Sequence, residues 1–268
     1  MTLIMEKKMS NNYWGARIAK AQDKITQKNI RQIERQIRKY YKSLANQVIT
    51  DFEDTYIKIL NTMENGRQPT PADLYKLDKY WHMQGQMRQQ LQKLGEKQIT
   101  KMTAIFEINF FEVYHSISLK GLDTYSTIDK DAVQQLLSQV WCADGKLWSQ
   151  RVWENTNKLA TTLNEELVHC IVAGKSPSYL KGLLQERFNV SFNNADMLVR
   201  TELAHIQTQA AQQRYKDYGI AEVEVLADKD ERQCEVCGKL HGKRYPVNAQ
   251  MPVPAHPRCR CTMIPVID

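Results

Sequence analysis

The chain has 268 residues, a net charge of +7 and a pI near 9.0, and it contains only 11 glycines and 8 prolines. This shortage of residues that break regular structure excludes a loop-rich all-β sandwich and favours a mostly helical protein. No apolar run approaches the roughly 20 residues of a membrane helix, and the N-terminus lacks the apolar region of a secretory signal. The sequence therefore predicts a protein made in a reducing cytoplasm, without disulfides and without a membrane partner.

Three long helices are predicted in the first half of the chain. Residues 12–64 contain no proline and place most apolar side chains on one broad helical face. Residues 70–73 (Thr-Pro-Ala-Asp) supply an N-cap, a proline at the first helical position and an acidic residue that reaches back to the cap. This second helix is expected to end at Gly95, and a third is expected from about residue 97 to 119.

Helices continue after a predicted hinge at residues 121–129, until the hydrophobic period changes. The expected helices are a short one at about 130–142, a long one that ends at Ala173, a short one to about Phe188, and one that Asn193 caps and Gly219 ends. Residues 222–226 then alternate between polar and apolar, which predicts a strand, and a last strand is expected near 263–267. Four tryptophans are expected in the core: Trp81, Trp141, Trp148 and Trp153.

The last 35 residues hold four of the six cysteines. Cys234 and Cys237 are separated by two residues, a spacing that lets both sulfurs face one tetrahedral ion. His256 and Cys259 repeat this spacing, so the two pairs predict a closed, structural zinc site. Cys261 is an alternative ligand in place of His256, and His241 is a more distant candidate.

Basic residues gather on one face of the first predicted helix. They fall within an arc of about 100° at helical spacing. The residues are Lys20, Lys24, Lys28, Arg31, Arg35, Arg38, Lys39 and Lys42. A solvated helix face and non-specific contact with a DNA backbone are both consistent with this pattern. Residues 221–268 hold seven basic and seven acidic residues, so the +7 belongs to the helical body.

Several motifs in the last 70 residues occur together in a characteristic order. They are Arg200-Thr201-Glu202 on a predicted helix, Asp228 and Asp230 before Cys234 and Cys237, and Tyr245 ahead of the ending His256-Pro257-Arg258-Cys259-Arg260-Cys261. In this order they closely resemble the phage Mu F-like minor head proteins, also called phage head morphogenesis proteins. The strong motifs cover about residues 140–262. Some members of that family carry an additional toxin or enzyme domain after this module.

The resemblance implies a fold and a place of action. We expect a mostly α fold, with an elongated helical body and a small C-terminal α+β module stapled by zinc. Residues 1–125 would form a helical N-terminal region and residues 126–268 the Mu F-like domain, with the zinc-binding module at about 220–268. The family implies a virion component at the head interior or portal vertex, present in the host cytoplasm during assembly. Its implied partner is the portal protein, with the major capsid or scaffolding protein as a further candidate.

The resemblance implies a role in head morphogenesis and in DNA packaging or delivery, and the motifs of the sequence favour a non-enzymatic protein. No phosphate-binding loop, nucleophile elbow or dinucleotide fingerprint is present. Two alternatives stay open: a nucleic-acid-binding zinc protein, and a hydrolase or transferase that uses Glu202, Asp228 or Asp230. We expect Arg200, Glu202, Asp228 and Asp230 to form a structural ion-pair set instead of a catalytic site.

Overall fold

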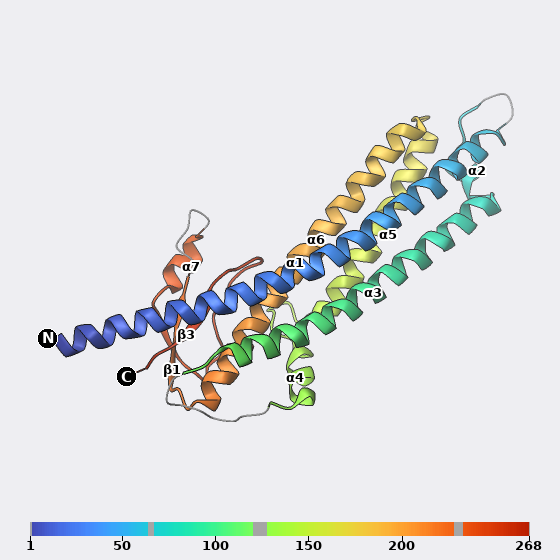
Figure 1. Cartoon of the computed structure of the whole chain (residues 1–268). Coiled ribbons are helices and arrows are strands. Elements are labelled where there is room, and N and C mark those ends of the chain that lie inside the picture. The colour runs from blue at the N-terminus through green and yellow to red at the C-terminus, as the bar shows by residue number, and fades with distance from the viewer. Residues whose placement is uncertain (1, 64–66, 120–127, 228–232, 268) are drawn as a thin grey trace. The chain divides into compact units, whose positions relative to one another are not determined.

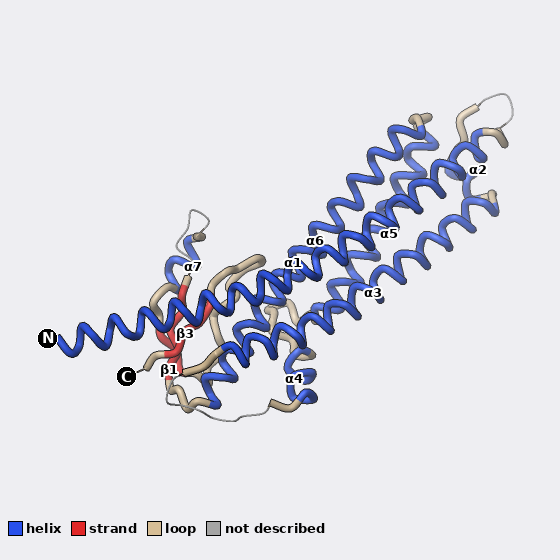
Figure 2. Tube along the Cα trace, in the orientation of Figure 1, coloured by secondary structure: helices blue, strands red, loops and turns tan. Residues whose placement is uncertain are grey.

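A computed structural model gives the fold and describes residues 2–63, 67–119, 128–227 and 233–267, with side chains from residue 15 onward. Helices dominate these residues (Figure 1), and the strands are short (Figure 2). The helices are α1 (Thr2–Leu60), α2 (Pro71–Tyr75), α3 (Asp78–Ser116), α4 (Lys130–Leu137), α5 (Trp148–Val172), α6 (Pro177–Asp217) and α7 (Glu235–Leu240). The strands are β1 (Glu222–Leu226), β2 (Arg244–Pro246) and β3 (Thr262–Pro265). The predicted mostly α fold with a small C-terminal sheet is confirmed.

The chain forms two compact units, and each is assembled from separated stretches of sequence. The first unit contains Met1–Ile33, Met102–Leu147 and Met197–Asp268, and the second contains Glu34–Lys101 and Trp148–Asp196. The predicted domain boundary at residues 125/126 and all but the last two residues of the hinge predicted at 121–129 lie outside the described residues. The division into residues 1–125 and 126–268 therefore stays a prediction.

Two expected helix ends in the second unit are wrong. Gly95 lies inside α3, and a Cβ atom added there would lie 2.5 Å from a ring carbon of Trp153. This glycine therefore permits a close approach of the Trp153 ring instead of ending the helix. Asn193 likewise lies exposed within the continuous α6, where asparagine lowers helix propensity only modestly.

The start signal at residues 70–73 is confirmed as a capping box, although the helix it begins is short. The Thr70 hydroxyl accepts a hydrogen bond from the Asp73 backbone N–H at 3.3 Å, and the Asp73 carboxylate accepts one from the Thr70 N–H at 2.9 Å. The expected burial of Trp81 is wrong, because its side chain is 56% exposed. The Trp81 ring stacks on Tyr75, and its indole N–H donates to the Tyr75 carbonyl, so its polar group is satisfied locally.

The three strands of the first unit form an antiparallel sheet in the order β2-β1-β3. Gly219 has a φ of +70°, which ends α6 as predicted and turns the chain into β1. Val223 and Val225 are buried, while Glu222 is exposed and Glu224 is half-buried, so the predicted alternation holds. β3 confirms the strand expected near residues 263–267, although it begins and ends slightly earlier, and β2 is a strand that the sequence did not predict.

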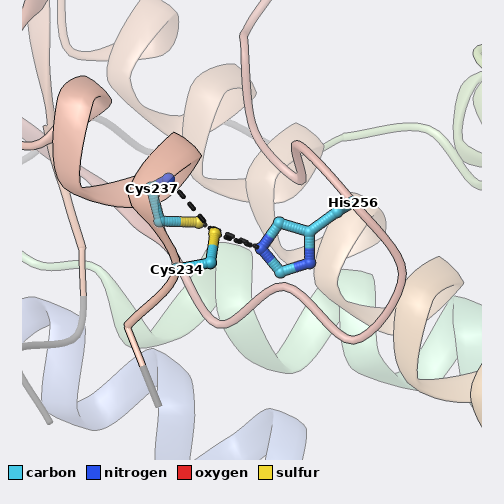
Figure 3. A group of neighbouring side chains, drawn as sticks. All are labelled: Cys234, Cys237 and His256. Atoms are coloured by element: carbon cyan, nitrogen blue, oxygen red, sulfur yellow. Dashed lines mark hydrogen bonds between the residues drawn. The ribbon is translucent and has the colours of Figure 1, made fainter. Parts of the chain in front are cut away.

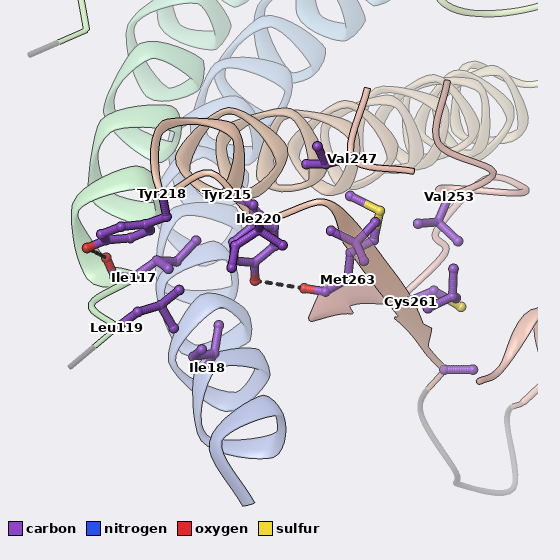
Figure 4. Packing of buried hydrophobic residues seen from close by; sticks show 14 of the residues in the cluster. Ile18, Ile117, Leu119, Tyr215, Tyr218, Ile220, Val247, Val253, Cys261 and Met263 are labelled. Carbon is purple, nitrogen blue, oxygen red and sulfur yellow. Dashed lines mark hydrogen bonds between the residues drawn. The ribbon is translucent and has the colours of Figure 1, made fainter. Parts of the chain in front are cut away.

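A buried cluster joins this sheet to the helices of the first unit (Figure 4). The Tyr215 hydroxyl donates to the Met263 carbonyl at 3.0 Å, and the Tyr218 hydroxyl donates to the Ile117 carbonyl at 3.2 Å. Three cysteines belong to the same cluster: Cys237, Cys259 and Cys261. The cysteine loops are therefore held by α6 and by the sheet. No helix within the described residues combines the length and apolar character that crossing a bilayer requires.

Candidate metal centre

The first pair of candidate ligands begins α7. Cys234 is the N-cap residue, and its Sγ accepts a hydrogen bond from the Cys237 backbone N–H at 3.3 Å. The Gly238 N–H bonds to the Cys234 carbonyl at 2.9 Å, which closes the turn beneath the sulfurs. The predicted spacing thus gives a tight turn that directs both sulfurs to one place.

The second pair lies on a turn whose shape depends on α6. The Cys259 N–H bonds to the His256 carbonyl at 3.1 Å, and Arg258 between them has a φ of +59°. A side chain at this φ costs roughly 1 kcal/mol or more relative to an ordinary conformation. The Thr201 hydroxyl accepts a hydrogen bond from the Arg258 N–H at 3.1 Å and donates one to the Met197 carbonyl at 2.7 Å. Thr201 therefore helps to hold the turn that presents His256 and Cys259.

Side chains of both turns converge on one point (Figure 3). His256 Nε2 lies 3.2 Å from Cys234 Sγ and 3.1 Å from Cys237 Sγ, and the sulfurs of Cys237 and Cys259 are 3.7 Å apart. In a zinc tetrahedron with Zn–S bonds of about 2.3 Å, neighbouring sulfurs are about 3.8 Å apart and sulfur and nitrogen about 3.6 Å apart. The sulfur pair fits this geometry, and a small outward shift of His256 would fit the other two distances.

Five side chains gather where a tetrahedral ion needs four. Cys234, Cys237 and His256 form one group whose ligand atoms lie within 4.8 Å of one another, and Cys237, Cys259 and Cys261 form a second. His241 belongs to neither group, and its Nδ1 accepts a hydrogen bond from the Ala227 N–H at 3.2 Å. The cluster could hold a metal ion, and the choice between His256 and Cys261 stays open.

The hydrogen bonds of the cluster favour coordination through particular atoms. His256 Nδ1 lies 2.9 Å from the Pro257 carbonyl, which places the ring proton on Nδ1 and leaves Nε2 as a lone-pair donor toward the sulfurs. A hydrogen bond from the Cys261 thiol lowers the pKa of Cys259 to about 5, whereas burial raises the pKa of Cys237 to about 12. The bond to Cys259 raises the pKa of Cys261 above its usual range.

The residues of the expected ion-pair set have varied surroundings. Glu202 is buried, and its carboxylate accepts a hydrogen bond from the Trp141 indole N–H at 2.9 Å. The Trp141 ring also stacks on His205 at 4.2 Å between ring centroids. Arg200 is half-buried, while Asp228 and Asp230 lie outside the described residues. The ion-pair set stays a prediction, and the Trp141 partner of Glu202 was missed because 61 residues separate the two.

The predicted basic face is solvent-facing. All eight basic residues from Lys20 to Lys42 are exposed. Two of them have acidic partners: Lys28 pairs with Glu112 at 2.5 Å, and Arg38 pairs with Glu34 at 2.8 Å. Both readings of this face, a solvated surface and a DNA contact, are compatible with that exposure.

The fold and the cysteine centre together define a helical protein with a small C-terminal module that combines a sheet and a cysteine cluster. Residues 161–264 match the family described as Phage Mu protein F like protein. This match supports a phage Mu F-like head morphogenesis protein and confirms the resemblance of the motifs.

The chain is also similar to one enzyme. It is 27% identical over 142 residues to the NAD(+)--arginine ADP-ribosyltransferase EFV of Enterococcus faecalis. The match covers 46% of this chain and 29% of that protein, so the chain spans less than a third of the relative's length. No solved structure matches the chain.

Proposed function

We propose that the chain is a non-enzymatic minor head protein of a tailed phage or prophage, which associates with the portal protein and acts in head morphogenesis and in DNA packaging or delivery. The match of residues 161–264 to the Mu F-like family carries this proposal. Such a protein would reside at the head interior or portal vertex of the virion and would be present in the host cytoplasm during assembly. The major capsid or scaffolding protein is a further candidate partner.

Co-expression with the portal protein tests this role. We expect the chain to co-purify with portal assemblies and to be present in purified particles at fewer copies than the major capsid protein. Particles assembled without the chain should be defective in assembly, in DNA content or in DNA delivery. If the chain neither binds portal nor occurs in purified particles, the proposal is wrong.

Zinc is the metal that we propose for the cysteine centre, held by Cys234, Cys237, His256 and Cys259 with Cys261 as the alternative ligand. Soft thiolates in a tetrahedral arrangement favour this redox-inert ion. Four protein ligands leave no open position for a substrate, so the role of the ion would be structural. The binding energy would stabilise a small module, since structural zinc contributes about 10–16 kcal/mol in short zinc-binding peptides.

Metal analysis of purified variants tests the ligand set. We expect about one zinc per wild-type chain, loss of zinc in Cys237→Ser, and retention in the matched control Cys142→Ser, because Cys142 lies outside the cluster. Comparison of His256→Asn with Cys261→Ser decides the fourth ligand, since only the true ligand should matter strongly. A wild-type chain without metal would refute the zinc proposal.

A transferase activity is the second candidate, because the matched Enterococcus faecalis protein is named as an ADP-ribosyltransferase. We infer instead that the two proteins share the Mu F-like module, in line with the 29% of the relative that the match covers. Glu202 is buried against the Trp141 indole, which favours a packing role over contact with a substrate. NAD⁺-dependent modification of arginine by the wild-type chain, abolished in Glu202→Gln with folding intact, would overturn this inference.

Non-specific DNA binding through the basic face is a third candidate, supported by the exposure of Lys20, Lys24, Arg31, Arg35 and Lys42. It predicts salt-sensitive binding to any duplex, because released counterions drive such contacts. Filter binding that finds no affinity at low salt would exclude it.

A further inference from the structure

A large cavity lies beside the candidate metal centre, within the first unit. Its volume is about 1230 Å³, which exceeds the roughly 300–1,000 Å³ of small-molecule pockets. One wall is α1 from Ala16 to Arg31, and another is formed by residues 256–262, which lead into β3. Arg200 of α6 and Leu226 of β1 also line it. The cavity is therefore sized for a segment of polypeptide instead of a metabolite.

Basic side chains line both walls of the cavity. Lys20 and Arg31 come from α1, Arg200 from α6, and Arg258 and Arg260 from the loop. Lys20 and Arg31 are exposed, and neither forms an ion pair with a residue that the structure describes.

Two acidic residues, Asp23 and Glu224, also line this space, and Glu224 lies 3.4 Å from the Arg244 guanidinium. The described charged side chains of the lining therefore carry an excess of three positive charges. A zinc ion with three thiolates would contribute one negative charge, so the lining stays positive. Its charge is complementary to an acidic partner.

Besides these charged groups, the lining residues that the structure describes include both aliphatic and polar side chains, and none of them is Phe, Tyr or Trp. Ile30, Leu226 and Ile264 contribute aliphatic side chains, and several alanines contribute small ones. Grooves that bind single-stranded nucleic acid combine positive charge with aromatic side chains on which bases stack. Within the described part of the lining, the lack of Phe, Tyr and Trp favours peptide over nucleic acid.

We propose that this cavity is a docking groove for an acidic segment of a partner protein, in which carboxylates contact the basic walls and small aliphatic side chains contact Ile30, Leu226 and Ile264. In naming another head protein as the source of the segment, the inference rests on the proposed function. The groove also gives a role to Arg258 and Arg260, the two residues of the His-Pro-Arg-Cys-Arg-Cys ending that alternate with its candidate metal ligands. The metal centre would then fix one wall of a binding site.

The test uses the full chain and a fluorescein-labelled peptide of about ten residues that alternates Glu and Leu. Fluorescence anisotropy at about 50 mM salt should detect binding, and about 300 mM salt should weaken it. The variant Lys20→Glu/Arg31→Glu reverses two charges that line the groove and should lower the affinity at least about tenfold. A peptide that alternates Lys and Leu should not bind.

A matched control separates the groove from general charge. Lys24→Glu/Arg35→Glu makes the same change in net charge on exposed positions of α1 that do not line the cavity, and it should keep the affinity within about twofold. Equal loss in both variants, or no binding by the wild-type chain, would overturn the proposal. The proposal would also be overturned if a single-stranded oligonucleotide bound more tightly than the peptide and if only Lys20→Glu/Arg31→Glu abolished this binding. If the groove proposal fails in this way but the chain still co-purifies with portal, the proposed function stands.

Discussion

A substitution of Thr201 tests whether α6 supports the candidate metal centre. Its hydroxyl accepts the Arg258 backbone N–H at 3.1 Å, and Arg258 lies between two candidate ligands at a φ of +59°. The substitution Thr201→Val keeps the shape of the side chain but removes this acceptor. The turn that carries His256 and Cys259 then loses a fixed contact with α6. Part of the metal-binding free energy must therefore order this turn, which lowers the metal affinity.

The size of the effect follows from the exposure of Arg258. An intramolecular hydrogen bond contributes about 0.5–1.5 kcal/mol net. Because Arg258 is exposed, water can replace the lost acceptor, so the lower part of this range applies. A loss of about 0.5–1 kcal/mol corresponds to about a two- to fivefold weaker metal affinity.

Competition with a chromophoric zinc chelator measures this affinity directly. Thr201→Ser is the matched control, since it retains the hydroxyl, and it should bind zinc as the wild type does. Adding Arg258→Gly to Thr201→Val should restore part of the affinity, because glycine adopts a positive φ without steric cost. Unchanged affinity in Thr201→Val, or an equal loss in Thr201→Ser, would show that the hydrogen bond does not support the centre.

Further predictions concern packing and pH. Gly95→Ala should lower the free energy of unfolding by about 1–2 kcal/mol in denaturant titrations, because overpacking against Trp153 outweighs the helical gain of about 1 kcal/mol. Gly85→Ala in the same helix has nothing within 4 Å of the added carbon and should stabilise by about 0.5–1 kcal/mol. Burial lowers the pKa of His205 to about 4. The unfolded chain therefore takes up more protons than the folded chain below about pH 6.5, and stability falls as the pH falls toward 4. Between pH 7 and pH 5 the loss should be about 1–2 kcal/mol, and His205→Phe should flatten this dependence.

Local signals in the sequence were reliable where one short segment decides the structure. The capping box at residues 70–73 and the helix end at the positive-φ Gly219 each depend on a few residues, and both appear as predicted. The expected break at Gly95 is wrong because packing against Trp153 decides that position, and the expected cap at Asn193 is wrong because asparagine lowers helix propensity only modestly. Gly95 reflects a close approach of Trp153, a residue 58 positions later in the chain, which no local pattern contains.

The candidate site was predictable only in part, for a similar reason. The two-residue spacings indicated the two turns and their sulfur and nitrogen atoms, which the structure brings together. The role of Thr201 depends on contact with a loop 57 residues away, and the burial of Glu202 depends on Trp141. Both residues belong to a motif whose chemistry suggested ion pairing, so the sequence identified the positions without their contacts.

The positive charge of the first helix separates into two surfaces in the structure. Lys20 and Arg31 line the cavity beside the metal centre, whereas Lys24, Arg35 and Lys42 are exposed without lining it. A DNA backbone would draw on all exposed cations and would bind with a salt dependence that scales with their number. Among the cations of α1, a peptide in the groove would depend on Lys20 and Arg31 alone. Loss of DNA binding in Lys24→Glu/Arg35→Glu, with peptide binding intact, would therefore assign different partners to the two surfaces of one helix.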